Sequence, residues 1–426
     1  MKTYIALTAV CFSLLCLESA AQLTNKGAQV TIANGAMVYT SWGVQNSSAG
    51  KITNNGSIVS DSFITNNSEC IISGNGSYTI QGSWKNSGTF SAGTSKLIFF
   101  GKGNSDITTG GANLYDLQLN KNAKGMLNMK DASKVLHSIQ FLATKNWVQL
   151  NKNILTLDTN CIITGYNDKK YFITNDTGLL RKVKVGNTKF TFPVGFNKST
   201  YNPLSITESG TADNYSVRCL EQALLNGGSG SAITHGGIGV SWLIREGVAG
   251  GANATVEAQW DPSKGDQLPG FDSAKCMVVR YNGTAWDFNA TLAGSASGTT
   301  TKTKKRNGVT AVGYFTILST ANPTLENSIA AVNSDNLNQH NTPGVQVLVY
   351  PTIVQNSVNL SVTKKNENIQ TMNITVVDGS GRTILRKEKI NFQSQQISLP
   401  HLSSGIYLVL IEYGDYKYNQ RIIVSQ

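Results

Sequence analysis

The chain has 426 residues, of which 41 are glycines and only 14% are charged, and it is rich in Asn, Ser and Thr. This composition argues against a helical protein and favours turn-rich β structure. At this length several domains are expected, and a hydrophobic fraction of 40% is enough to fill their cores.

The formal net charge of +11 raises the question of a polyanionic partner. The positive residues are spread along the chain, however, and the only dense run, Lys302 to Arg306, lies in a stretch rich in Gly, Ser and Thr that we interpret as a loop. A solvated loop on a basic protein is the simpler interpretation, and a patch for an anionic glycan or a lipid headgroup is the alternative. We expect no nucleic-acid partner.

Residues 1–21 have the features of a secretory signal peptide. Lys2 provides a basic start, Ile5 to Leu17 form an apolar core, and the small residues Ser19, Ala20 and Ala21 precede Gln22. The apolar core is too short to span a bilayer, and no later run approaches that length, so no transmembrane segment is expected. A membrane anchor is the alternative interpretation of this stretch.

Export makes disulfide bonds possible for the four cysteines that remain after removal of the signal, which are Cys70, Cys161, Cys219 and Cys276. Their wide, irregular spacing disfavours a zinc site, and no cofactor is expected. The pairing cannot be deduced from the sequence. A Cys219–Cys276 link is favoured because both residues fall on predicted strands of one domain, with buried free thiols as the alternative.

Residues 22–177 are repetitive. Asn34-Gly35, Asn55-Gly56 and Asn75-Gly76 recur at separations of 21 and 20 residues, with brief apolar strands between them. This period predicts a right-handed β-helix or β-solenoid, in which each coil buries its inward side chains by stacking on the next. A meander of hairpins is the alternative, because Asn-Gly is also a common hairpin turn.

Two tryptophans of this region, Trp42 and Trp84, lie 42 residues apart, which corresponds to two coils. They are candidate glycan contacts if they stack on one outer face. The alternative is that they fill the core or cap of the solenoid.

Residues 178–322 change character and predict a β-sandwich with an immunoglobulin-like pattern of strands. The turn Asn282-Gly283, between Tyr281 and Trp286, is a strong hairpin signal. The following polar stretch, residues 323–344, is interpreted as a linker.

Residues 345–426 contain seven short predicted strands at close spacing, which indicate a small antiparallel β-sandwich. Three groups of residues occur in order along it: Val349-Tyr350-Pro351; Val377-Asp378-Gly379-Ser380-Gly381-Arg382; and Leu402-Ser403-Ser404-Gly405-Ile406-Tyr407-Leu408-Val409 with the closing Arg421-Ile422-Ile423-Val424. This segment resembles the type A C-terminal sorting domain of the type IX secretion system. Thr352-Ile353 stands where that family usually has Asn-Pro after the Tyr-Pro pair.

The resemblance implies export across a bacterial outer membrane, with the type IX secretion machinery as a partner. In the family the sorting domain is removed after translocation, and the cargo is often attached to surface lipopolysaccharide. The motif residues carried over are Tyr350, Pro351, Asp378, Gly381, Arg382, Gly405, Ile406, Tyr407 and Arg421. The arrangement of solenoid, sandwich and sorting domain also resembles that of many uncharacterised surface proteins, and this resemblance supplies no catalytic residues.

Catalytic signatures are sparse. The chain has four histidines, none in a metal-binding spacing, and it has no G-x-S-x-G elbow and no P-loop. The acids of the solenoid do not repeat at the coil period, so no catalytic set and no metal site is assigned; these acids are Asp61, Glu69, Asp106, Asp116, Asp131, Asp158, Asp168 and Asp176. We expect a non-enzymatic secreted or surface protein that is adhesive, structural or in contact with an extracellular polysaccharide or a host or matrix glycan. The alternative is a secreted polysaccharide lyase or glycoside hydrolase on a β-helix.

Overall fold

The computed structural model describes residues 21–122 and 125–320, and, within the C-terminal region, residues 345–350, 353–354, 357–364, 371–378, 382–391, 395–399, 402–413 and 416–424. All but the last residue of the predicted signal peptide, and the whole of the predicted linker, lie outside these ranges. The chain divides into two compact units, Met1–Asn327 and Ser328–Gln426. Within the described ranges, no helix is both long and apolar enough to cross a membrane.

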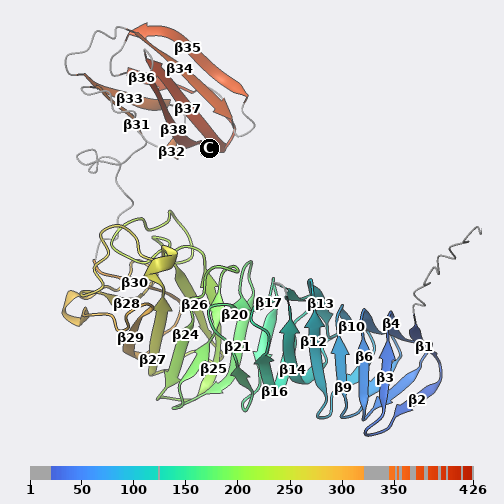
Figure 1. Ribbon diagram of the computed structural model, residues 1–426. Helices are drawn as coiled ribbons and strands as arrows, with labels where there is room; N and C mark the ends of the chain where they lie inside the picture. Colours follow the sequence, from blue (N-terminus) through green and yellow to red (C-terminus); the bar gives the residue numbers. More distant parts are fainter. Residues whose placement is uncertain are drawn as a thin grey trace, which may run out of the picture. The chain divides into compact units, whose positions relative to one another are not determined.

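The first unit begins as a β-solenoid of about eight coils, as the sequence period predicts (Figure 1). One side is a nine-stranded parallel sheet of β1 (Gln22–Lys26), β4 (Gly43–Ser47), β7 (Phe63–Asn66), β10 (Trp84–Asn86), β13 (Ser105–Thr108), β15 (Met126–Met129), β17 (Asn146–Gln149), β20 (Lys170–Ile173) and β23 (Val194–Gly195). A second, short side contains β2 (Gln29–Ile32), β5 (Lys51–Asn54), β8 (Ile71–Ser73) and β11 (Thr89–Ser91).

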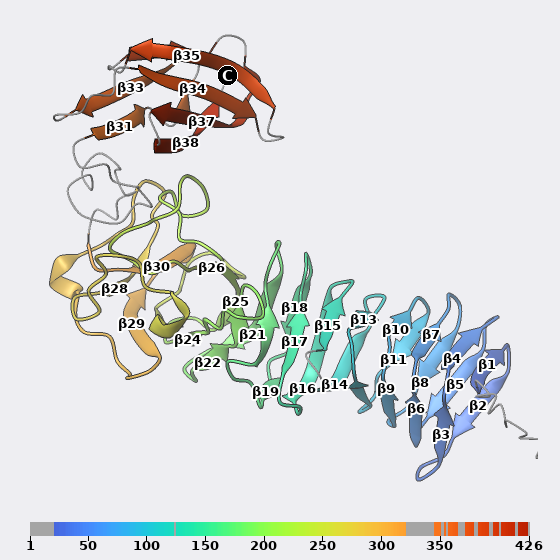
Figure 2. The ribbon, with the colours of Figure 1, turned by 45° about the horizontal axis from the view of Figure 1, so that its top comes forward.

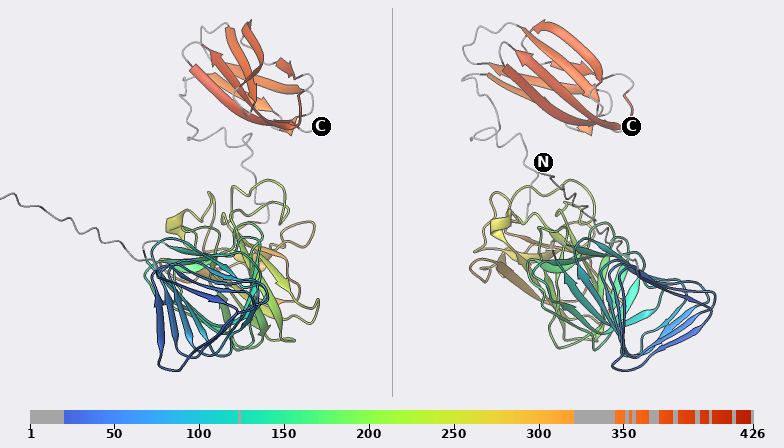
Figure 3. Two further views of the ribbon diagram at one scale, coloured as in Figure 1. Left: turned by 90° about the vertical axis from the view of Figure 1, so that its right-hand side faces the viewer. Right: turned by 45° about the vertical axis from the view of Figure 1, so that its right-hand side comes forward.

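The third side belongs to a thirteen-stranded sheet, which we call the long sheet. Its solenoid strands are β3 (Met37–Thr40), β6 (Ser57–Ser60), β9 (Ser77–Ile80), β12 (Lys96–Gly101), β14 (Asn113–Lys121), β16 (Ser133–Phe141), β18 (Ile154–Leu157), β19 (Ile162–Thr164) and β21 (Leu179–Val185). Since the short side ends at β11, the first four coils are three-sided and the later ones are flatter. The view from the N-terminal end shows the coils lying one over another (Figure 3).

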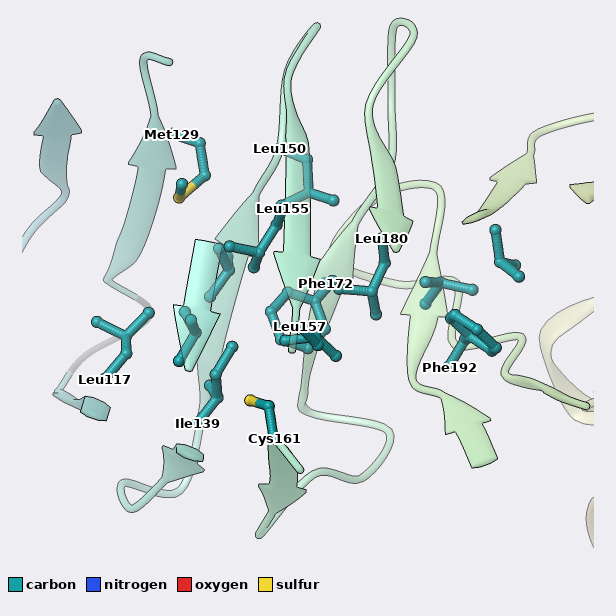
Figure 4. Packing of buried hydrophobic residues seen from close by; sticks show 14 of the residues in the cluster. Leu117, Met129, Ile139, Leu150, Leu155, Leu157, Cys161, Phe172, Leu180 and Phe192 are labelled. Carbon is teal, nitrogen blue, oxygen red and sulfur yellow. The ribbon is translucent and has the colours of Figure 1, made fainter. Parts of the chain in front are cut away.

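The core consists of columns of like side chains from successive coils. Parallel register pairs Ile58 with Tyr78, Tyr78 with Leu97, and Leu97 with Leu117, and all four side chains are buried. Figure 4 shows the same arrangement further along, where aliphatic and aromatic side chains point into the space between the sheets. Burial of this kind depends on the neighbouring coil, so the repeat itself creates the core.

A column of buried asparagines runs through the first four coils. Nδ2 of Asn25 donates to Oδ1 of Asn46 at 2.9 Å, Asn46 donates to Asn66 at 2.9 Å, and Asn66 donates to Asn86 at 2.8 Å. Their spacings of 21, 20 and 20 residues match the coil period. The sequence prediction relied on the exposed Asn-Gly turns and missed this ladder.

Two of the three predicted Asn-Gly turns, at Gly56 and Gly76, use glycine for close stacking. A Cβ on Gly76 would lie 2.4 Å from the carbonyl oxygen of Gly56, and one on Gly56 would lie 2.2 Å from that of Ala36. These separations are far below van der Waals contact, so any side chain would force neighbouring coils apart.

A lysine ammonium is buried where the later coils begin. Nζ of Lys121 donates to the carbonyl oxygens of Gln81 at 2.7 Å and Phe100 at 3.0 Å and to Oγ of Ser105 at 2.8 Å. Burial lowers the pKa of Lys121 to about 8. The side chain therefore binds three segments of the wall together, at the cost of removing its charge from water.

The long sheet continues without interruption from the solenoid into the predicted sandwich region (Figure 2). Its last strands are antiparallel: β25 (Asp213–Leu220), β26 (Ser241–Glu246), β30 (Tyr314–Leu318) and β28 (Met277–Arg280). A four-stranded sheet forms the other layer, which we call the cover sheet: β22 (Phe190–Phe192), β24 (Leu204–Glu208), β27 (Ala254–Trp260) and β29 (Lys302–Val309). Two short 3-10 turns, Pro262–Lys264 and Ala290–Leu292, complete it.

One hydrophobic core extends through the coils and the sandwich. Trp242 of β26 and Trp260 of β27 belong to the same cluster as Ile32 of the first coil. The predicted hairpin at Asn282-Gly283 is also present, since Tyr281 and Trp286 form a bridge across it. The prediction that the basic run from Lys302 to Arg306 lies in a loop is wrong. The run lies in β29 and pairs with β27 as a strand.

The favoured Cys219–Cys276 disulfide is also wrong, because all four described cysteines are free and buried. Cys219 lies in β25 and Cys276 precedes β28, and β26 and β30 intervene between these strands. Three strand spacings amount to about 14 Å, twice the reach of a disulfide.

The second unit contains two sheets, and the seven predicted strands are all present. A three-stranded sheet contains β31 (Val345–Tyr350), β33 (Ser357–Lys364) and β36 (Gln395–Ser398), and a five-stranded sheet contains β32 (Ile353–Val354), β38 (Tyr416–Val424), β37 (Gly405–Tyr413), β34 (Thr371–Asp378) and β35 (Thr383–Asn391). Its own core includes Met372, Ile374, Val376 and Val409. Along β34 the buried Met372, Ile374 and Val376 alternate with less buried residues, as a strand with one core-facing side requires.

Candidate functional site

The two candidate glycan-binding tryptophans do not form a platform. Trp42, in the turn before β4, is 52% exposed, whereas Trp84 is only 1% exposed. The ring of Trp84 packs edge-on against Tyr78 and Phe90, with centroids 5.4 and 5.0 Å apart. Trp84 occupies an inward column position in β10, so the assignment of Trp84 as a glycan contact is wrong, and Trp42 remains an isolated candidate.

Several solenoid carboxylates connect one coil to the next. Asp61 accepts a hydrogen bond from the Tyr39 hydroxyl at 2.5 Å, Asp106 pairs with Lys130 at 3.1 Å, and Asp158 pairs with Lys134 at 3.0 Å. Asp131 accepts bonds from the backbone N–H groups of Thr109 and Gly110 in the preceding coil. Each of these carboxylates therefore has a structural partner about one coil away.

One group on the outer face of the long sheet contains the residue types of a hydrolytic site. Nδ1 of His137 lies 2.7 Å from Oδ1 of Asp116, its ring stacks on Tyr115 at 4.8 Å, and the hydroxyl of Ser138 also donates to Asp116. In a Ser-His-Asp triad the imidazole accepts the serine proton, whereas here the carboxylate bonds both groups. Among the described residues, no group of three or more His, Cys, Asp and Glu side chains is placed to hold a metal ion.

A pocket of about 590 Å³ lies where the last coils meet the cover sheet. Its walls are the turn before β19, the end of β21, the following turn and the start of β22, and fifteen residues line it: Thr159, Asn160, Cys161, Ile162, Ile163, Tyr166, Lys182, Lys184, Val185, Gly186, Asn187, Thr188, Lys189, Phe190 and Thr191. Three of these described lining residues are lysines, and none is a carboxylate. The pocket is therefore polar and positively charged, with two aromatic rings.

Lys182 forms the inner wall of this pocket. Its ammonium donates to the carbonyl oxygens of Asp158, Thr159 and Cys161 at 2.5, 2.8 and 2.9 Å and lies 5.3 Å from the centroid of Phe190. Because all three N–H donors are used, Lys182 contributes charge and rigidity rather than a free donor. Burial lowers its pKa from the ordinary lysine value.

The other two lysines are exposed at the pocket mouth. Lys184 has a φ of 54° and lies in an irregularity of the pairing between β21 and β25, where the register shifts between Lys182 and Val185. Lys189 pairs with Glu257 of the cover sheet at 2.8 Å. Lys182, Lys184 and Lys189 fall within eight residues, a local cluster of charge that was the one signal in the sequence for this pocket.

The sorting-domain motif residues fall mainly at strand ends. Asp378, the last residue of β34, accepts bonds from the backbone N–H and the Nε of Arg382 at 3.0 and 3.1 Å, which closes the turn between β34 and β35. Gly405 begins β37, Ile406 is 54% exposed, and the buried Tyr407 donates to the carbonyl oxygen of Ser403 at 3.1 Å.

The remaining motif residues are placed only by their strands or not at all. Tyr350 ends β31, and Arg421 lies in β38 opposite Leu408. Pro351 and Gly381 lie outside the described residues. Recognition of these residues by a partner stays a prediction.

A signal-like segment, a compact all-β cargo unit and a separate small β unit at the C-terminus are the features of an exported protein with a C-terminal address. Residues 348–425 match the family model described as "Secretion system C-terminal sorting domain". The chain therefore carries a type IX sorting domain and is a cargo of that secretion system, directed to the cell surface or the extracellular space. Neither the curated proteins nor the solved structures include a match to the chain.

Proposed function

We propose that the cargo is a non-enzymatic surface or secreted protein, a rigid spacer that serves adhesion, glycan contact or envelope structure after the signal peptide and sorting domain are removed. The observation that carries the proposal is the continuity of the long sheet and its core from the first coil to the end of the sandwich. A body with one core and no flexible joint resists bending, which suits a spacer.

The coil-to-coil role of the acids also supports the proposal. A lyase or hydrolase needs two or three carboxylates, or a carboxylate with Lys or Arg, directed at one substrate position. Asp61, Asp106, Asp131 and Asp158 instead bond neighbouring coils. Their side chains contribute to stacking.

The second candidate, a secreted polysaccharide lyase or glycoside hydrolase, is favoured by one observation. The exposed His137 and the carboxylate of Asp116 form a paired acid and base on an outer sheet face. We therefore propose to test both functions on the same preparation.

The test uses the purified cargo, residues 22–322. Binding is measured on an array of bacterial, plant and host glycans, and turnover is measured in parallel on a panel of polysaccharides. Binding without turnover is the expected outcome. Release of new reducing ends or unsaturated uronates, abolished by His137→Gln and retained by the control His235→Gln, would establish the enzyme instead.

A further inference from the structure

We infer that the pocket at the junction of the solenoid and the cover sheet binds an acidic saccharide, through the positive charge of Lys184 and Lys189 and the rings of Tyr166 and Phe190. This inference rests on the proposed function, for which it supplies a ligand class and a site.

The charge of the pocket selects an anion. Three lysines and no carboxylate are among its fifteen lining residues. The Lys182 ammonium is held by three carbonyl oxygens, so the pocket keeps a fixed positive charge near its inner wall. Lys184 is exposed and keeps its donors for a ligand, as a carboxylate or sulfate would require.

The remaining lining groups suit a sugar. Tyr166 and Phe190 are half-buried and line the pocket, so part of each ring offers an apolar surface to the C–H face of a pyranose. Asn160, Asn187 and Thr188 are exposed and supply amide and hydroxyl groups for sugar hydroxyls. A volume of about 590 Å³ lies within the usual range for small-ligand pockets.

The backbone at Lys184 gives an independent reason to look here. Its φ of 54° lies in the left-handed region, which lysine rarely adopts, and its N–H donates to Oδ1 of Asn214 at 2.9 Å. Irregularities of strand pairing redirect side chains and are common beside binding sites. A strained conformation persists where the surrounding structure imposes it, and here it places a lysine at the pocket mouth.

Lys189 is a second cation of the pocket, and it is already paired with a carboxylate. Its ammonium is 2.8 Å from Oε2 of Glu257, and both side chains are partly exposed. A ligand anion must compete with this carboxylate. Removing the carboxylate charge should therefore strengthen binding, which is a gain that a merely structural lysine would not produce.

The experiment measures calorimetric binding of the mature chain to four tetrasaccharides: oligogalacturonate, its methyl ester, a heparin-derived sulfated tetrasaccharide and neutral cellotetraose. We expect an acidic tetrasaccharide to bind and the neutral and esterified ones not to bind. Lys184→Gln should lower affinity about tenfold, Lys184→Arg should retain it, and Glu257→Gln should raise it. Lys85→Gln, which removes an exposed charge in β10 of the nine-stranded sheet, is the matched control and should change nothing.

Equal binding of cellotetraose, unchanged affinity of Lys184→Gln, or an equal loss in Lys184→Gln and Lys85→Gln would overturn the inference. Absence of binding by all four probes would also overturn it. The proposed function fails separately, if the bound acidic tetrasaccharide is cleaved by the wild type. Preference between the carboxylated and the sulfated probe identifies the anion.

Discussion

The amide of Asn46 donates to Oδ1 of Asn66 across adjacent coils at 2.9 Å, with both side chains fully buried. Asn66 in turn donates to Asn86 and to the carbonyl oxygens of Cys70 and Thr89. One side chain thus satisfies polar groups of two coils. Stacking of these coils therefore depends on the asparagine ladder.

Asn66→Ala should lower the free energy of unfolding of the cargo by about 2 to 4 kcal/mol, because buried acceptors lose their donor. Asn34→Ala, at an exposed turn, should change it by less than about 0.5 kcal/mol. Urea unfolding followed by tryptophan fluorescence measures both. Equal midpoints for the two variants would show that the ladder contributes nothing to stability.

The two tryptophans provide a matched pair of the same residue type. Trp84→Ala should cost about 3 to 5 kcal/mol, because it leaves a cavity beside Tyr78 and Phe90. Trp42→Ala should leave stability nearly unchanged, since its ring is half exposed. Thermal unfolding of both variants decides the matter, and a larger loss for Trp42 would contradict the burial assigned here.

Stability should depend on pH through Lys121. Its pKa is about 8 in the folded protein and 10.5 in the unfolded chain, so the unfolded state binds more protons between these values. The contribution of Lys121 to the free energy of unfolding is fully present above pH 10.5 and is lost as the pH falls through 8. The urea concentration at the unfolding midpoint of the wild type, relative to that of Lys121→Met, should therefore rise between pH 8 and 10. A constant difference over this range would refute the pKa shift.

The four cysteines of the mature protein should remain thiols. Burial raises the pKa of Cys161 to about 12 and raises that of Cys219 and Cys276. At pH 8 the native cargo should not react with a thiol reagent, and after unfolding without reductant it should react at four sites per chain. Fewer than four sites would indicate a disulfide.

Deletion of residues 345–426 should leave nearly all of the product inside the outer membrane, because the sorting domain carries the export address. Asp378→Ala, which opens the turn closed by Arg382, should reduce export partially. Immunoblotting of cell and medium fractions measures the distribution, with Lys305→Gln in the full chain as a control. Normal extracellular amounts of the truncated protein would remove the basis for the proposed surface role.

The local sequence was sufficient to predict those parts of the fold that are defined by a repeat or by a short motif. The Asn-Gly spacing predicted the coils, the close spacing of seven short strands predicted the sandwich of the second unit, and the motif from Asp378 to Arg382 indicated the sorting domain. These features depend on neighbours in sequence or on a fixed repeat, so they can be read without coordinates.

The sequence by itself determined an all-β chain with a repeating solenoid and a terminal sorting domain, because residue periodicity dictates which side chains share a face. Only the tertiary structure decided that Trp84 points inward while Trp42 does not, that Cys219 and Cys276 are separated by two strands, and that the long sheet passes from solenoid to sandwich. It also decided that Lys184 lies at a pocket mouth. These outcomes depend on strand register and sheet order, which join residues far apart in sequence and leave no local pattern.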